Sequence, residues 1–370
     1  MFSDSTPVHP GMDWLDPADA DPGRQALLRD WLRVQVAFGL QPETFAAPLR
    51  RLGTPRRLLR EMDLSPGLSD ADVERHAEIL RSHRVALLPV LSPRYPARLA
   101  RLPDPALVLL LRGCGSLELF DRPMVAIVGA RAASVYGRGV ARELARELAA
   151  AGVVVISGLA RGVDAMAHEG ALDAGGITLA VQACGPERIY PPEHRGLASR
   201  IREAGLVLTE MPPGTPPRGA YFPLRNRLIS ALASAVVVVE ARLRSGSLVT
   251  ARHALDQGGE VLAVPGPVGA PTSEGTNRLL RDGARPCLDA SDVLDALGWS
   301  EPVQPRAPAR ALPPDAAARA ILAALREAPA SRDELAQRLS LVPAALAPPL
   351  LELELAGWLA EDRDGRFRVV

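Results

Sequence analysis

Three loops in the middle of this chain carry residue types that bind phosphate. In the clearest one, Ala241–Arg252 (ARLRSGSLVTAR), the residues Ser245, Gly246 and Ser247 follow an apolar run and precede a helical pattern. A helix that begins at such a loop presents unpaired backbone N–H groups and the positive end of its dipole to an anion. The segment therefore predicts a phosphate site, with the neighbouring arginines as further ligands.

The other two loops also follow apolar runs. GARAASVYG comes after Met124–Val128, and SGLARG comes after Val153–Ile156. Glycine permits tight turns there, and arginine and serine side chains can reach a phosphate at a helix start. In the alternative interpretation the glycine only turns the chain and the arginine pairs with a carboxylate. The residues predicted to bind phosphate in these two loops are Gly129, Arg131, Ser134, Ser157, Gly158 and Arg161.

An aromatic residue stands beside further cations in FPLRNRLIS, where Phe222 precedes Arg225, Asn226 and Arg227. A ring beside arginines at a phosphate-lined edge suits single-stranded nucleic acid, because a base stacks on the ring while the arginines hold the backbone. Such stacking contributes about 1–3 kcal/mol per base. A structural role stays open, with Phe222 in the core and Arg227 in an ion pair.

Other features exclude several classes of enzyme. All 43 Lys-or-Arg positions hold arginine, so no lysine is present for a Schiff base, a pyridoxal phosphate site or a P-loop. Arg131 replaces the second glycine of the dinucleotide motif, which argues against a nicotinamide or flavin cofactor. Asp164 and His168 form either a catalytic pair or a satisfied buried pair, and no nucleophile or third metal ligand is spaced with them. We expect no catalytic residue, no cofactor and no metal.

The bulk composition fits a cytoplasmic protein. The formal net charge is zero and 47% of the residues are apolar, which is enough for a core. The longest apolar runs are shorter than the roughly eighteen residues that a membrane helix needs. Cys114, Cys184 and Cys287 form no CxxC pair, which argues against a zinc site and a disulfide framework and fits a reducing compartment.

Apolar runs alternate with helical patterns between Met124 and Leu297. The runs are rich in β-branched residues, which predicts parallel strands covered on both faces. We therefore expect an α/β fold, a doubly wound (Rossmann-like) parallel sheet with all three phosphate loops at the carboxyl edge of its strands. The predicted strands are Met124–Val128, Val153–Ile156, Ile177–Val181, Leu206–Thr209, Val236–Glu240 and Val261–Val264.

Helical patterns flank this core on both sides. The last part of the chain combines three helical patterns with a hairpin, which predicts a winged helix, and its third helix has no arginine, which favours a protein contact over DNA reading. Ser331 and Glu334 are spaced as a capping box. The predicted divisions are a disordered leader at 1–22, a helical domain at 23–84, a linker with extension strands at 85–123, the Rossmann-like domain at 124–298, a proline-rich linker at 299–314 and a winged-helix domain at 315–370.

In order, these motifs resemble those of the DNA-processing protein A (DprA, also Smf) family. The match covers nearly the whole predicted Rossmann-like core; Ala183 departs from it, standing where the family usually has glycine. The helical region at 23–84 is similar to the family's SAM-like or helix-hairpin-helix-like domain. The matching segments are GARAASVYG, SGLARGVDAMAHEGAL, ACGPERIYPPEH, PPGTPPR, FPLRNRLIS, EARLRSGSLVTARHALDQG, VPGP and GTNRLLRDGA.

The resemblance implies a function without catalysis. Members of the family bind single-stranded DNA during natural transformation and recombination, protect it, dimerise through the Rossmann-like domain, contact RecA and help to load it. The resemblance implies that the residues singled out above at the three loops and in FPLRNRLIS contact DNA. A second interpretation is a Rossmann-like nucleotide phosphoribohydrolase of the lysine-decarboxylase-like group, but VPGPVGAPTSEGTN breaks the motif that supplies its catalytic glutamate.

Overall fold

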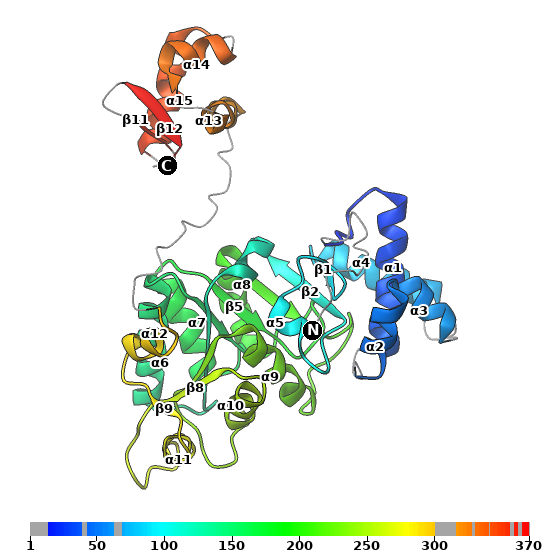
Figure 1. Ribbon diagram of the computed structural model, residues 1–370, viewed down its shortest axis with the longest axis vertical. Coiled ribbons are helices and arrows are strands. Elements are labelled where there is room, and N and C mark those ends of the chain that lie inside the picture. The colour runs from blue at the N-terminus through cyan, green and yellow to red at the C-terminus, as the bar shows by residue number, and fades with distance from the viewer. Residues whose placement is uncertain are drawn as a thin grey trace. The chain divides into compact units, whose positions relative to one another are not determined.

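The computed structural model describes residues 14–38, 43–62, 69–299, 316–327, 330–339, 341–355, 359–361 and 365–369. The chain divides into two compact units, 1–305 and 306–370, which Figure 1 draws in a colour ramp along the sequence. Within the described ranges, every helix is too short or too polar to cross a membrane.

A nine-stranded sheet forms the centre of the first unit, in the order β1-β2-β6-β5-β4-β3-β7-β8-β9. Strands β3 to β9 are parallel to one another, and the order reverses at β3, between β4 and β7. The predicted doubly wound parallel sheet is therefore confirmed. The strands are β1 (Ala86–Pro89), β2 (Val108–Gly113), β3 (Met124–Val128), β4 (Val154–Ser157), β5 (Thr178–Val181), β6 (Leu206–Thr209), β7 (Ala235–Val238), β8 (Glu260–Ala263) and β9 (Arg285–Pro286).

The two ends of the sheet extend beyond the six predicted strands. β1 and β2 add an antiparallel pair next to β6, and β9 contributes two paired residues next to β8. The periodicity of a two-residue strand is too short to read from a sequence. The strand candidates in the predicted linker 85–123 are thus part of the main sheet.

Helices cover both faces of this sheet (Figure 1). One face buries side chains of α6, α7 and α12, and the other buries side chains of α5, α9 and α10. α6 and α7 approach closely because α7 has Gly170, where an added Cβ would lie 2.0 Å from the carbonyl oxygen of Arg142. The helices are α5 (Ala97–Ala100), α6 (Val135–Ala150), α7 (Val163–Asp173), α8 (Arg195–Ala204), α9 (Tyr221–Leu232), α10 (Gly246–Asp256), α11 (Glu274–Arg281) and α12 (Ala290–Ala296).

Four helices precede the sheet and pack against its β1–β2 end. They are α1 (Pro22–Phe38), α2 (Glu43–Leu52), α3 (Pro55–Glu61) and α4 (Asp70–Ser82). Their common core contains the fully buried side chain of Trp31, as the helical periodicity of this region predicts.

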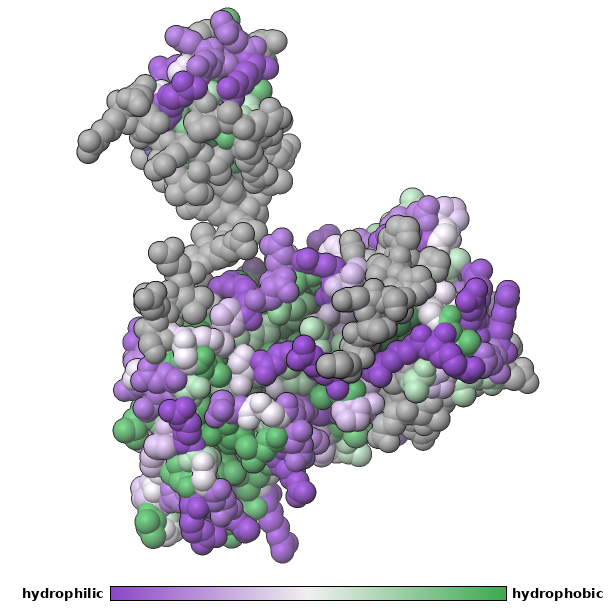
Figure 2. Space-filling model, in the orientation of Figure 1, coloured by the Kyte–Doolittle hydropathy of each residue, from purple (hydrophilic) through white to green (hydrophobic). Residues whose placement is uncertain are grey.

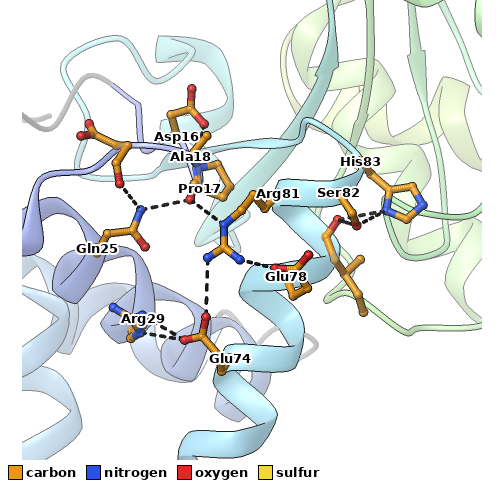
Figure 3. Close-up of polar contacts among 12 residues, drawn as sticks. Asp16, Pro17, Ala18, Gln25, Arg29, Glu74, Glu78, Arg81, Ser82 and His83 are labelled. Carbon is orange, nitrogen blue, oxygen red and sulfur yellow. Dashed lines mark hydrogen bonds and ion pairs between the residues drawn. The ribbon is translucent and has the colours of Figure 1, made fainter.

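The expectation of a disordered leader fails for residues 14–21, while residues 1–13 lie outside the described part. Leu15 is buried and forms a β-bridge with Leu87. Figure 3 shows how the following residues are held: the carbonyl oxygen of Pro17 accepts hydrogen bonds from Gln25 at 3.1 Å and from Arg81 at 3.3 Å. A polar, proline-rich composition concealed these specific contacts.

The second unit combines three helices with a three-stranded sheet in the order β10-β12-β11, in agreement with the predicted winged helix. Ser331 and Glu334 form the predicted capping box, since the backbone N–H of each donates to the side chain of the other, at 2.8 and 3.3 Å. Most of the predicted linker 299–314 lies outside the described residues. The elements are α13 (Ala316–Glu327), β10 (Ala330–Ser331), α14 (Arg332–Leu339), α15 (Pro343–Leu355), β11 (Leu359–Glu361) and β12 (Arg366–Val369).

Candidate nucleic-acid interface

A cavity of about 290 Å³ opens at the carboxyl edge of the sheet. It lies beyond the ends of β3, β4 and β7, next to the point where the strand order reverses, which is where doubly wound folds bind ligands. The loops after these strands and the start of α9 supply its walls. The predicted site residues that line it are Gly129, Arg131, Phe222, Arg225, Asn226, Ser245, Gly246 and Ser247.

An arginine and two aromatic rings form one side of this cavity. The guanidinium of the exposed Arg131 lies over the ring of Phe222, 4.8 Å from the ring centroid. The ring of Tyr190 packs against the ring of Phe222, with 5.6 Å between the two centroids and an angle of 49° between the ring planes. The arrangement offers a flat surface and a positive charge together, as needed to stack a base and hold its phosphate.

The start of α10 forms another side. Ser245 caps this helix, because its hydroxyl accepts from the N–H of Ser247 at 3.3 Å, and the two hydroxyls lie 2.7 Å apart. Asn226 donates to the carbonyl oxygen of Gly246 at 3.2 Å and so joins α9 to this loop. Arg242 and Arg244 are exposed just before it. Backbone N–H groups and hydroxyls therefore lie together at this helix start, and two exposed arginines precede it in the chain.

The start of α6 differs from that of α10, because a carboxylate of the protein itself occupies its anion-binding position. Ser134 caps the helix, yet its backbone N–H and hydroxyl both donate to the buried Glu240, at 2.9 and 2.6 Å. Gly137 makes room for this carboxylate, since an added Cβ would lie 2.4 Å from it. A phosphate predicted at this helix start would have to replace Glu240, so we place none there.

A buried acid and a buried arginine organise the floor of the cavity. Asp164 accepts from the backbone N–H groups of Gly158 and Ala160, at 3.1 and 3.3 Å. Burial raises the pKa of Asp164, and the nearby Arg225 opposes this effect. Burial also disfavours the charged form of Arg225, which lowers its pKa to about 10. Arg225 donates to the carbonyl oxygens of Gly158, at 2.8 Å, and of Val181.

Both Asp164 and His168 belong to the described part of the chain, and no hydrogen bond joins their side chains. The Nδ1 atom of His168 lies 2.7 Å from the hydroxyl of Thr178, and burial lowers the pKa of His168 to about 3. The structure therefore shows two separately buried groups and no acid–histidine pair: Asp164 accepts from backbone N–H groups, and His168 contacts Thr178 through Nδ1, while its Nε2 atom has no hydrogen-bond partner among the described residues. Within the described ranges, no three potential metal ligands lie close together.

Two predicted phosphate ligands at the end of β4 turn inward. Ser157 is fully buried and its hydroxyl donates to the carbonyl oxygen of Ile127 at 2.7 Å. Gly158 lies under Arg225, and an added Cβ would meet its guanidinium at 2.5 Å. Ser157 and Gly158 therefore support the residues of the cavity wall and do not line the cavity themselves.

Two predicted arginines also lie apart from the lining. Arg161 is exposed beside the cavity and pairs with Glu193. Arg227 is buried and points to the other side of α9, where it pairs with Glu210 at 2.6 Å and Asp104 at 2.9 Å. This is the structural role that the sequence left open for Arg227, and we leave it out of the interface.

Several residues of the interface were not singled out from the sequence. Tyr190 and Arg218 lie in proline-rich loops without periodicity, and Tyr221, whose ring centroid is 6.0 Å from the guanidinium of Arg218, is the first residue of α9. Glu240 was detectable in principle, because it is an isolated acid at the end of an otherwise apolar run. Its partner, the start of α6, is more than a hundred residues away in sequence.

The fold and the cavity together define a Rossmann-like protein with an arginine- and hydroxyl-rich pocket at the carboxyl edge of its sheet. The model of the family described as DNA recombination-mediator protein A matches residues 86–298, and that of the DprA winged helix domain matches residues 304–365. The chain belongs to the DNA recombination-mediator protein A family.

Individual relatives agree with this assignment. Protein Smf of Escherichia coli is 40% identical over 76% of this chain and 77% of its own length. A putative DNA processing protein DprA of Mycobacterium tuberculosis is 44% identical over 71% of this chain and 69% of its own length. Among solved structures, DprA of Streptococcus pneumoniae is 30% identical with a TM-score of 0.59, covering 74% of this chain and 96% of that one. DprA of Helicobacter pylori is 34% identical with a TM-score of 0.50, and the match covers 55% of this chain and 92% of that one.

Proposed function

We propose that this protein binds single-stranded DNA in the cavity at the carboxyl edge of its sheet, without catalysing a reaction, and serves DNA processing in natural transformation. The observation that carries the proposal is the stack of Arg131 on Phe222 next to the start of α10. A base can continue the stack, while the N–H groups and hydroxyls at Ser245–Ser247 face its phosphate.

The relatives support the same ligand. The solved structure from Helicobacter pylori is described by its single-stranded DNA binding mode, and other relatives are named DNA processing proteins. Arg131, Phe222, Asn226 and Ser245–Ser247 are the proposed contacts. Arg225 has a structural part in the proposal, because two backbone carbonyls accept from its buried guanidinium.

The finer parts of the proposal follow from the family resemblance. They are protection of incoming DNA, contact with RecA and its loading, a homodimer through the Rossmann-like domain, and a cytoplasmic location. A dimer is tested by light scattering at two protein concentrations. RecA loading is tested by RecA filament assembly on single strands coated with a single-strand-binding protein, with and without this protein.

A binding titration tests the main proposal. Fluorescent oligothymidylate and a duplex of equal length are titrated with the full chain at several salt concentrations. We expect preference for the single strand, and a slope of log affinity against log salt of about −0.7 for each phosphate contacted. Preference for the duplex, or affinity that does not respond to salt, would contradict the proposal. Release of free base from nucleoside monophosphates would instead support the phosphoribohydrolase.

A further inference from the structure

Two short segments outside the cavity concentrate positive charge in a chain whose formal net charge is zero. Residues 43–62, which form the hairpin of α2 and α3, contain five arginines and two acids. Residues 90–106, around α5, contain three arginines and one acid, Asp104, which already pairs with the buried Arg227. We call the exposed arginines of these two segments the α2–α5 basic surface; they are Arg50, Arg51, Arg56, Arg57, Arg60, Arg94, Arg98 and Arg101.

The fold brings the two segments together. Arg50, near the end of α2, donates to the carbonyl oxygen of Ala100, at the end of α5, with a distance of 3.3 Å. The hairpin turns at Gly53, whose φ of +71° favours glycine, and Thr54 caps α3. Leu49, Leu58 and Leu59 of the hairpin are buried, whereas its arginines are exposed. Figure 2 shows strongly hydrophilic residues in a band from the region of α5 toward the N-terminal helices.

Some of these arginines pair with carboxylates, and others do not in the part of the chain that the structure describes. Arg51 pairs with Glu61, and Arg56 with Asp30. Arg57, Arg60 and Arg101, by contrast, have no carboxylate partner among the described residues.

The like charges around α5 lie close enough to affect one another. Arg98 donates to the hydroxyl of Ser234 at 2.7 Å. Burial and, second, the neighbouring charge of Arg101 lower the pKa of Arg98. Uncompensated like charges in proximity are unfavourable unless an anion neutralises them.

Arginines on the neighbouring helices α1 and α4 behave differently. Arg29 pairs with Glu74 at 2.9 Å, and Arg81 pairs with both Glu74 and Glu78 (Figure 3). Arg75 pairs with Asp72 at 2.5 Å. In its described part, the bundle therefore pairs these arginines with carboxylates on one side and leaves two, Arg57 and Arg60, without a carboxylate partner on the α2–α5 side, next to Arg101 at the end of α5.

The basic surface connects to the cavity through α9. α5 packs on α9, which starts beside Phe222 at the cavity and ends just before Ser234, the partner of Arg98. Twelve helical residues at about 1.5 Å each give a separation of about 18 Å. Phosphates of one strand are at least about 3.4 Å apart along the helix axis in duplex DNA, so no more than about five nucleotides bridge this distance.

We propose that the α2–α5 basic surface is a second binding site for the phosphate backbone of the single strand that leaves the cavity, an inference that rests on the proposed function. Guanidinium groups match phosphate oxygens bidentately. Among the residues of both segments whose side chains the structure describes, no large apolar side chain is exposed, so we assign this surface contacts with phosphates and not with bases. Binding there is therefore independent of sequence.

The test compares two oligothymidylates, one of about 4 nucleotides, which is too short to extend from the cavity to the surface, and one of about 30 that reaches the surface. The surface variant carries Arg57→Gln, Arg60→Gln and Arg101→Gln. The matched control carries Arg29→Gln, Arg75→Gln and Arg81→Gln, which remove the same charge from the neutralised side. Thermal melting followed by circular dichroism verifies that each variant is folded.

We expect the surface variant to bind the short oligonucleotide like the wild type. With the long one, its salt slope becomes less steep by about 2, which is three contacts at about 0.7 each, while the control variant keeps the wild-type slope. An unchanged slope with the long oligonucleotide, or an equal change in the control, overturns the inference and leaves the cavity proposal intact. Failure of the wild type to bind either oligonucleotide overturns the proposed function instead.

Discussion

The contact between Arg131 and Phe222 gives the sharpest prediction for the cavity. Phe222→Ala removes the ring on which a base is proposed to stack, and such a loss costs about 1–3 kcal/mol. Taking about 2 kcal/mol, and about 1.4 kcal/mol per tenfold change, the dissociation constant for oligothymidylate rises about 30-fold. Loss of Arg131 in Arg131→Gln removes one charge contact and makes the salt slope less steep by about 0.7.

The two substitutions are expected to couple. At 4.8 Å the guanidinium and the ring are within cation–π range, which contributes about 0.5–1 kcal/mol at an exposed site. Because the ring and the guanidinium are proposed to meet the strand as one stack, removing either one weakens the strand contact of the other, so the double variant should lose less binding free energy than the sum of the two losses, by about 0.5 kcal/mol or more. Fluorescence anisotropy titrations of all four proteins at one salt concentration measure the coupling.

Arg146→Gln is the matched control, since Arg146 is exposed on α6 and pairs with Glu143 in the same helix. It removes the same charge away from the cavity and should leave affinity and salt slope at wild-type values. The reasoning is refuted if Phe222→Ala binds within twofold of the wild type, or if Arg146→Gln weakens binding as much as Arg131→Gln does.

Three further predictions concern stability and are read by urea unfolding. Gly170→Ala inserts a Cβ against the backbone of α6 and should lower the free energy of unfolding by about 1–3 kcal/mol or more; an unchanged midpoint would show that α6 and α7 separate easily. Arg227→Ala leaves the buried carboxylate of Glu210 without its closest partner, and a loss of about 3–5 kcal/mol is expected, whereas a loss below about 1 kcal/mol would argue against the buried pair. Burial lowers the pKa of His168 to about 3, whereas in the unfolded chain it is about 6.5. Between these two pH values the unfolded state binds one proton more than the folded state. Each pH unit of acidification there lowers the free energy of unfolding by up to about 1.4 kcal/mol. From pH 7 to pH 5 the wild type should therefore lose about 2 kcal/mol more than His168→Gln, and parallel pH profiles would contradict this assignment.

The sheet was predictable because each of its parallel strands is buried on both faces. Val125 and Ala126, for example, contact opposite helical layers, so the strand reads as one uninterrupted apolar run. The capping box at Ser331 and Glu334 was predictable for a similar reason, since all its atoms lie within four residues. Both signals are local in sequence.

The details of the site depend on partners that are distant in sequence. Ser134 and Ser245 both start helices after strands, and their local sequences predict the same anion site. Only the fold brings Glu240 to the first and leaves the second open. Likewise, Arg225 and Arg227 differ by half a turn of α9, and the elements on either side decide that one lines the cavity and the other forms a buried ion pair.

Photocrosslinking tests the location of the bound strand most directly. The full chain is irradiated with an oligothymidylate that contains 5-iodouracil, which reacts with aromatic rings stacked on the base, and the linked peptides are identified by mass spectrometry. We predict crosslinks to Phe222 or Tyr190, lost in Phe222→Ala or Arg131→Gln. Crosslinks found only in residues 316–369, or unaffected by both substitutions, would contradict a strand bound at the carboxyl edge of the sheet.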